Sequence, residues 1–143
     1  MTTTVSYSTV FDQTADRVWS IIRDFNSYPV WVASVSDSYI EDGKPGDAVG
    51  AIRNFTEYGI RIRQRLLAHS DPARSYTYES CEPLAAMTYY QGTARVTPIV
   101  DGNRALVEWS VAFECPAEAR DNCRKVLEEA MPQWLKSLRA VLE

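Results

Sequence analysis

A long amphipathic helix at the C-terminal end follows a region in which every segment has the patterning of a β-strand. Residues 117–142 place apolar side chains at helical spacing. These side chains are Val126, Leu127, Ala130, Met131, Trp134, Leu135, Leu138 and Val141. Pro132 lies inside this pattern, and we expect it to kink or break the helix because proline lacks the backbone N–H and its ring crowds the preceding turn. Such a kink would let the helix end move at the entrance of a pocket.

Seven segments are predicted to be strands of one antiparallel sheet. They span residues 5–11, 34–41, 49–56, 58–68, 75–81, 87–100 and 104–115. Between the first two, Thr14 is expected to cap a short helix, and Pro29 then favours a tight connection or a single second turn. This order predicts an α+β fold of the helix-grip type, in which a curved seven-stranded sheet wraps around the long C-terminal helix. We expect one domain over residues 1–143.

The composition excludes several classes of protein. A net charge of −4 and a pI near 5.1 argue against a nucleic-acid binder, which usually carries a basic excess. No run of ~18 apolar residues is present, so no membrane span is expected. The polar start, Met1 to Thr4, lacks the pattern of a signal peptide, and Cys81, Cys115 and Cys123 are odd in number and not spaced as CxxC. These features predict a cytoplasmic location with reduced thiols.

One helix covers only part of such a sheet, so side chains fill the rest of the concave face or leave a cavity there. Alternation puts Ile60, Ile62, Gln64 and Leu66 on the inner face of one strand and three arginines on its outer face. Gly92 and Ala94 are small where a filled core would have larger side chains, which favours a cavity. The chain also has eight tyrosines and four tryptophans, more amphipathic rings than a core requires.

Several polar residues are predicted to face this cavity. Alternation assigns Tyr76, Tyr78 and Ser80 to one inner face, and Tyr90 and Gln64 to the inner faces of neighbouring strands. Arg53 shares a face with Val49, Ala51 and Phe55, so it either points inward or pairs with an acidic group at the sheet edge. Because buried polar groups need partners, this set predicts a pocket for an apolar ligand that bears oxygen atoms.

Three motifs resemble those of the START-like proteins of the SRPBCC superfamily. They are the run RVWSIIRDF at residues 17–25 with YPVW at 28–31, the strand VGAIR at 49–53, and EWS at 108–110 with the long helix that follows. The subgroup most similar to this chain is the polyketide cyclase/dehydrase family. The resemblance covers the whole chain and implies a helix-grip fold and a hydrophobic ligand. It also implies pocket-lining positions, at Arg53, Gln64, Tyr78, Tyr90 and Trp109.

Our first hypothesis is a cofactor-independent cyclase or dehydratase-like enzyme. Arg53, Tyr78 and Tyr90 are its candidate catalytic residues, because a tyrosine hydroxyl can donate to an enolate and an arginine can hold developing negative charge. The candidate ligand-binding residues are Gln64, Tyr76, Ser80, Gly92, Trp109, Trp31, Trp134 and Met131. No metal is expected, since the only histidine is His69 and the three cysteines are scattered.

Two alternatives stay open. The first is a non-catalytic protein that binds or transports a lipid or another small molecule. The second is an interaction module that engages a protein partner through its sheet edge or through the stripe Arg61, Arg63 and Arg65. These arginines are typical of a solvated sheet face that pairs with Glu79, or they dock an acidic carrier protein that delivers the substrate. Both a monomer and a homodimer are compatible with the sequence.

Overall fold

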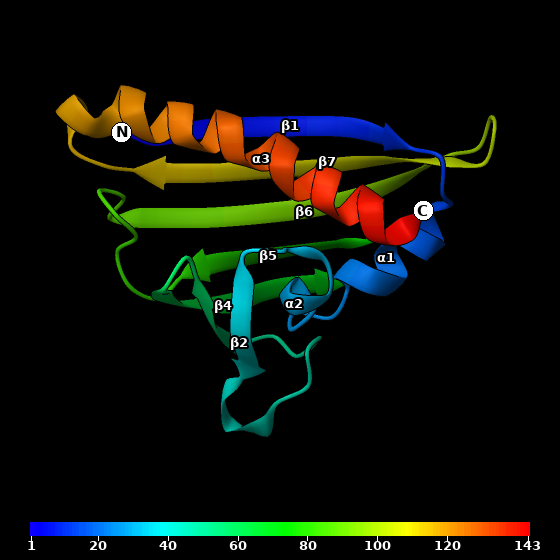
Figure 1. Cartoon of the computed structure of the whole chain (residues 1–143), viewed down its shortest axis with the longest axis horizontal. Coiled ribbons are helices and arrows are strands. Elements are labelled where there is room, and N and C mark those ends of the chain that lie inside the picture. The colour runs from blue at the N-terminus through cyan, green and yellow to red at the C-terminus, as the bar shows by residue number, and fades with distance from the viewer.

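Seven antiparallel strands form one curved sheet, which the computed structural model describes over residues 1–143 together with the helices that cover it (Figure 1). The strands are β1 (Thr3–Phe11), β2 (Val35–Ile40), β3 (Ile52–Glu57), β4 (Ile60–Ser70), β5 (Ser75–Ser80), β6 (Tyr89–Ile99) and β7 (Arg104–Glu114). Their order in the sheet is β1-β7-β6-β5-β4-β3-β2. The long helix α3 (Arg120–Leu142) runs obliquely across the strands, so the predicted helix-grip fold is confirmed.

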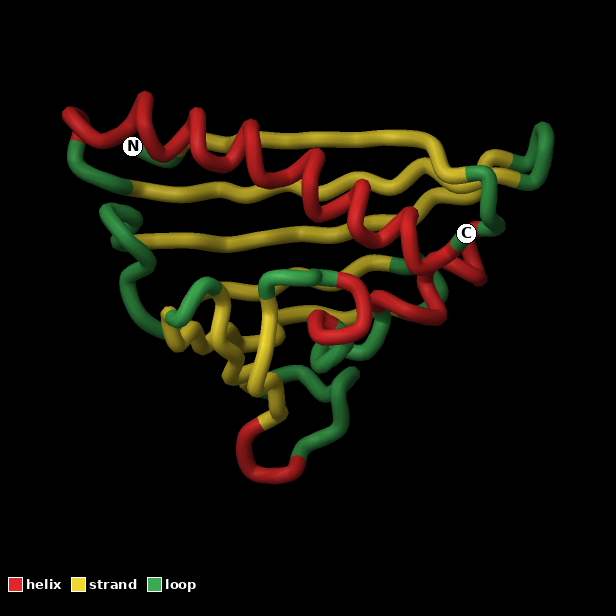
Figure 2. Tube along the Cα trace, in the orientation of Figure 1, coloured by secondary structure: helices red, strands yellow, loops and turns green.

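Two short helices connect β1 to β2, at the end of the sheet where α3 finishes (Figure 2). Thr14 caps α1 (Ala15–Ile22) as expected, because its Oγ1 accepts a hydrogen bond from the Arg17 N–H at 3.1 Å. α2 (Tyr28–Trp31) is the single turn that the sequence allowed, with Pro29 in its first positions. The remaining regular elements are two 3₁₀ turns, η1 (Glu41–Gly43) after β2 and η2 (Ala117–Ala119) before α3.

α3 continues through Pro132, so of the two expected outcomes, a kink or a break, the break is wrong. Its buried residues, Cys123, Leu127, Met131, Leu135, Leu138 and Leu142, repeat along one face on both sides of the proline. Burial of this common stripe holds both halves against the core, which offsets the hydrogen bond that proline cannot make. Val126 and Val141, which we assigned to the apolar stripe, lie on its flanks and are 51% and 39% exposed.

The strands overlap their predicted ranges, with one clear difference at the start of β3. This strand begins at Ile52 rather than at Val49, and Val49 is 64% exposed. The preceding residues form a turn in which the Ala51 N–H donates to the Ala48 carbonyl, and Gly50 has a φ of +91°. Such a φ favours glycine, so the pattern that resembled a strand at 49–51 is a turn.

The strand register arranges inward side chains in rows across the concave face. One row contains Arg53, Gln64 and Ser80. Tyr90 continues this row on β6, one residue beyond the last pair between β5 and β6. The next row contains Leu66, Tyr78, Gly92 and Val111, and a third contains Tyr76, Ala94 and Trp109. The polar residues that the sequence assigned inward therefore share one row, next to rows that are rich in aromatic rings.

Gly92 does not leave a cavity open, so our expectation for this residue is wrong. Tyr78 pairs with Gly92 across β5 and β6, and its ring lies over the glycine. A Cβ atom at position 92 would be only 2.2 Å from Tyr78 Cζ. The missing side chain therefore makes room for an aromatic ring, and Ala94 stands opposite Tyr76 in the same two strands.

Substitution of Gly92 by alanine tests this packing. The new Cβ would displace the Tyr78 ring, and we expect a loss of about 1–3 kcal/mol in the free energy of unfolding, as for other overpacked cores. Urea denaturation measures this loss. In a Tyr78→Leu background the same substitution should cost clearly less, because the clashing ring is gone. An equal cost in both backgrounds would show that steric conflict with Tyr78 is not the reason.

Candidate functional site

A cavity of about 680 Å³ lies between α3, α2 and the half of the sheet that contains β3 and β4. Most of its lining is apolar, including Trp31, Phe55, Ile62, Leu84, Met87 and Trp134. α3 contributes Val126, Ala130 and Trp134, which lie beside the stripe that packs on the core. The volume falls in the range of roughly 300–1,000 Å³ that is typical of small-molecule sites.

Gln133, Lys136 and Ser137 line this cavity from α3, and few polar side chains reach it from the sheet and α2. Tyr28, Gln64 and Tyr90 belong to its wall, and Glu57 lines it from the end of β3. Glu57 accepts a hydrogen bond from the Ser34 hydroxyl at 2.8 Å. The sequence analysis missed Glu57, although it continues the alternation of Arg53 and Phe55 along the same inner face. It also missed Tyr28, whose position depends on how Pro29 and α2 turn the chain.

Arg53 is fully buried and points inward, but it does not reach the cavity. Its Nε donates to Gln64 Oε1 at 2.8 Å and its Nη2 donates to Tyr28 Oη at 2.7 Å. Its Nη1 donates to the Phe25 carbonyl at 3.4 Å. The guanidinium carbon lies 3.9 Å from the Phe25 ring centre and 3.7 Å from that of Tyr28, at cation–π distances. All of these partners are neutral, so the alternative that Arg53 pairs with an acidic group is wrong.

Tyr28 and Tyr90 present protonated hydroxyls. Burial raises the pKa of Tyr90 well above its usual range, and the neighbouring Tyr78 acts in the same direction. Burial likewise raises the pKa of Tyr28 well above its usual range, even though Arg53 beside it acts in the opposite direction. Both groups are therefore hydrogen-bond donors at neutral pH rather than bases.

Tyr78 belongs to an aromatic cluster behind the cavity. Its hydroxyl accepts a hydrogen bond from Trp109 Nε1 at 3.1 Å. Phe25 and Tyr76 complete the cluster, with ring centres 5.9–6.0 Å from each other or from Tyr78. The rings fill this half of the concave face and hold Tyr78 away from the ligand space.

The structure places all but one of the predicted site residues in two groups. Those that line the cavity are Trp31, Gln64, Tyr90 and Trp134. Those buried in the core outside its lining are Arg53, Tyr76, Tyr78, Gly92, Trp109 and Met131. Ser80 is half-buried at the end of β5, where its hydroxyl donates to the Glu82 carbonyl at 2.8 Å. Of the proposed catalytic trio, only Tyr90 contacts the cavity directly.

The basic stripe on the outer face of β4 is largely ion-paired. Arg65 pairs with Glu79 at 3.0 Å, the partner expected from the sequence. Arg63 pairs with Glu41 at 2.7 Å and also with Glu82. The hydrogen bonds from Arg63 lower the pKa of Glu41 to about 2. These charges therefore behave as a solvated sheet face, and docking of an acidic carrier protein stays a prediction.

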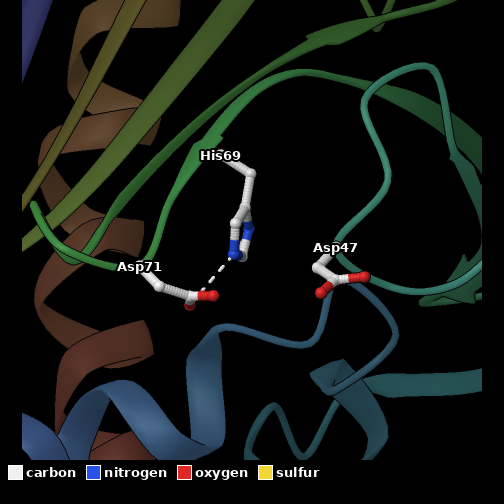
Figure 3. A group of neighbouring side chains, drawn as sticks. All are labelled: Asp47, His69 and Asp71. Carbon is white, nitrogen blue, oxygen red and sulfur yellow. Dashed lines mark hydrogen bonds and ion pairs between the residues drawn. The ribbon is translucent and has the colours of Figure 1, made fainter.

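Asp47, His69 and Asp71 form the one cluster with the side-chain types of a metal site (Figure 3). One potential ligand atom from each lies within 4.8 Å of the others. Arg23 already supplies a cation here, because its Nη2 is 3.2 Å from Asp47 Oδ2 and 3.0 Å from Asp71 Oδ2. Trp19 Nε1 also donates to Asp71 Oδ1 at 2.8 Å. The donor set fits an ion-pair network that ties α1 to the β4–β5 turn better than a metal centre.

Comparison with known proteins assigns the chain to a recognised group. Residues 2–143 match the family described as polyketide cyclase / dehydrase and lipid transport. No protein of curated function matches the chain. None of the helices has the length and apolar composition needed to cross a bilayer.

Solved structures share the whole architecture. An uncharacterised protein from Bacillus thuringiensis is 27% identical, with a TM-score of 0.86 over 99% of this chain and 100% of that one. A protein from Nitrosospira multiformis is 25% identical, with a TM-score of 0.84 over 99% and 97% of the two chains. Ara h 8.0201 is 11% identical, with a TM-score of 0.77 over 99% and 98%, and shows the fold alone.

The Asp71 network gives a test of its structural role. Hydrogen bonds from Arg23 and Trp19 hold the pKa of Asp71 well below its usual range. A carboxyl group with a lowered folded-state pKa stabilises the fold above about pH 4 and loses this effect as the pH falls. We therefore expect Asp71→Asn to lower the melting temperature at pH 7 and to flatten its decline below pH 4.

The matched control is Asp101→Asn, which removes an exposed carboxylate in the β6–β7 turn that belongs to no ion pair. It should change neither the melting temperature nor its pH profile. A rise in the melting temperature of the native chain on addition of Zn²⁺ or Ca²⁺, abolished by Asp71→Asn, would instead identify a metal site.

Proposed function

Because the chain belongs to the polyketide cyclase/dehydrase and lipid transport family of the SRPBCC superfamily, we propose that it binds and carries an apolar small molecule that bears oxygen atoms. Membership of this family supports a hydrophobic ligand. The observation that carries the finer proposal is the cavity of about 680 Å³, with apolar walls and with Tyr28, Gln64 and Tyr90 on one side. Apolar burial supplies affinity in such a site, and a few polar groups orient the ligand.

The geometry favours binding over the catalytic arrangement that we expected. Arg53 and Tyr78 are separated from the cavity by their own partners, so they do not contact a ligand there. Only Tyr90 of the three lines the ligand space. The acyclic chain of a cyclase substrate needs a group that polarises its carbonyl and a base that removes a proton. The predicted trio does not provide both.

An enzyme remains the second candidate because Glu57 and Tyr90 line the same cavity. A carboxylate can remove a proton next to a carbonyl group, and a tyrosine hydroxyl can donate to the enolate that forms. This pair replaces the predicted trio as the catalytic hypothesis. Three further points stay predictions. They are the cytoplasmic location, the docking of a carrier protein, and the oligomeric state, which is a monomer or a homodimer.

Filling the cavity tests the binding function. Ala130 lines the cavity from α3, so Ala130→Phe would occupy part of it with a ring. We expect at least a tenfold loss of affinity for Nile red, a neutral apolar dye, in a fluorescence titration. Glu129→Phe adds the same ring to the exposed side of α3 and is the matched control. Equal affinity of both variants and the native chain would place the dye outside this cavity and contradict the proposal.

Deuterium exchange tests the catalytic candidate separately. If Glu57 acts as a base, the protein will accelerate exchange next to the carbonyl of 2-undecanone in D₂O, as measured by mass spectrometry. Glu57→Gln should remove this acceleration, while dye affinity changes little because the amide keeps the shape of the carboxylate. No acceleration by the native chain, together with dye binding, would leave the protein as a carrier only.

A further inference from the structure

Arg53 is a buried cation for which the protein supplies no counter-charge. Its hydrogen-bond partners are an amide, a phenol and a backbone carbonyl. None of the ion pairs of the protein includes it. An arginine stays charged in a protein interior, and buried charges are normally paired. The fold therefore contains one buried positive charge that no acidic residue balances.

Both side chains that separate Arg53 from the cavity are forced to offer donors to it. Arginine has no acceptor, so Gln64 must turn Oε1 toward Arg53 and keep its NH₂ group for another partner. Tyr28 Oη accepts from Arg53 Nη2, so its own O–H points elsewhere. No acceptor within the protein is found for either of these donor groups, and both residues line the cavity. Tyr90 lines the cavity in the same row as Gln64 and adds a third protonated hydroxyl, which lies next to that of Tyr78.

We propose that the ligand carries a carboxylate, which binds at the wall formed by Tyr28, Gln64 and Tyr90. This inference rests on the proposed binding function and names the chemical class of its ligand. A carboxylate offers only acceptors, which complements the Gln64 NH₂ group and the two tyrosine O–H groups of this wall. Charge-assisted hydrogen bonds to an anion are roughly twice as strong as neutral ones, so an acid is favoured over an alcohol or an ester.

The charge of Arg53 reaches such an anion through short hydrogen bonds. An oxygen bound to Tyr28 Oη would lie roughly 5 Å from Arg53 Nη2, about two hydrogen-bond lengths away. Opposite charges favour each other at this separation, above all where water is excluded. Arg53 is already removed from water by the fold itself, so the anion does not have to desolvate its partner.

Glu57 sets the direction of the ligand. It lies four residues beyond Arg53 on the same inner face of β3, roughly 13 Å along the strand. A carboxylate of the ligand is repelled there and attracted at the Arg53 end. Lys136 also lines the cavity, but it belongs to the exposed side of α3, where water screens its charge.

Matched pairs of acid and neutral ligand test this inference. Dodecanoate with dodecan-1-ol, and 2-naphthoate with methyl 2-naphthoate, compete with Nile red at pH 7.5. We expect the acid of at least one pair to bind at least about tenfold more tightly than its neutral partner. If neither acid binds more tightly than its neutral partner, the inference is overturned. Binding of the dye in that case leaves the proposed function intact. Failure of the dye and of all four compounds to bind overturns both.

Two variants connect the preference for acids to Arg53. Gln64→Glu places a carboxylate against Arg53 Nε, which keeps the buried cation satisfied and cancels its charge, so the preference should disappear. Tyr28→Phe removes one donor and should reduce the preference several-fold. Gln91→Glu and Tyr89→Phe are matched controls on β6, outside the cavity lining, and should keep the native preference. Undiminished preference in Gln64→Glu would overturn the role of Arg53.

Discussion

The Arg53 guanidinium determines how the sheet, the first helices and the cavity wall fit together. It joins β3 to β4 through Gln64. It also joins both strands to the segment between α1 and α2 through Phe25, and to the start of α2 through Tyr28. The aromatic faces of Phe25 and Tyr28 enclose the cation, so its desolvation is offset by neutral groups in several directions. Removal of any partner would leave a buried donor unsatisfied, which links the position of the cavity wall to the stability of the core.

The concave face of the sheet is divided between a solid half and a hollow half. Rows of aromatic residues around Tyr78 and Trp109 pack against each other and leave no room for a ligand. The row of Arg53, Gln64 and Tyr90 forms the boundary, and the cavity begins on its far side. The many tyrosines of the chain thus serve two purposes. Some fill the core, and others present hydroxyls at its edge.

Periodicity was sufficient to predict the fold and much of the boundary row. Alternation identified the inner faces of β4, β5 and β6, and therefore Gln64, Tyr78 and Tyr90 as inward residues. It could not distinguish a residue that lines a cavity from one that packs in a core, because this depends on neighbours in other strands. Gly92 shows the difference, since its small size accommodates a ring from β5. The partners of Arg53 were equally hidden, because Tyr28 reaches it only through the turn at α2.

α3 separates the anchoring of the helix from the shape of the cavity. The stripe from Cys123 to Leu142 is buried in the core, and only Leu127 of it also lines the cavity. Val126, Ala130 and Trp134 on the adjoining face border the ligand space. Substitutions on this second face can therefore change the outline of the cavity without disturbing the packing that keeps the helix in place. A lineage with this architecture can acquire new ligands by small steps at a few positions. Relatives only 25–27% identical keep this backbone, and the separation of anchoring residues from cavity residues is one physical route by which a shared fold can take different ligands.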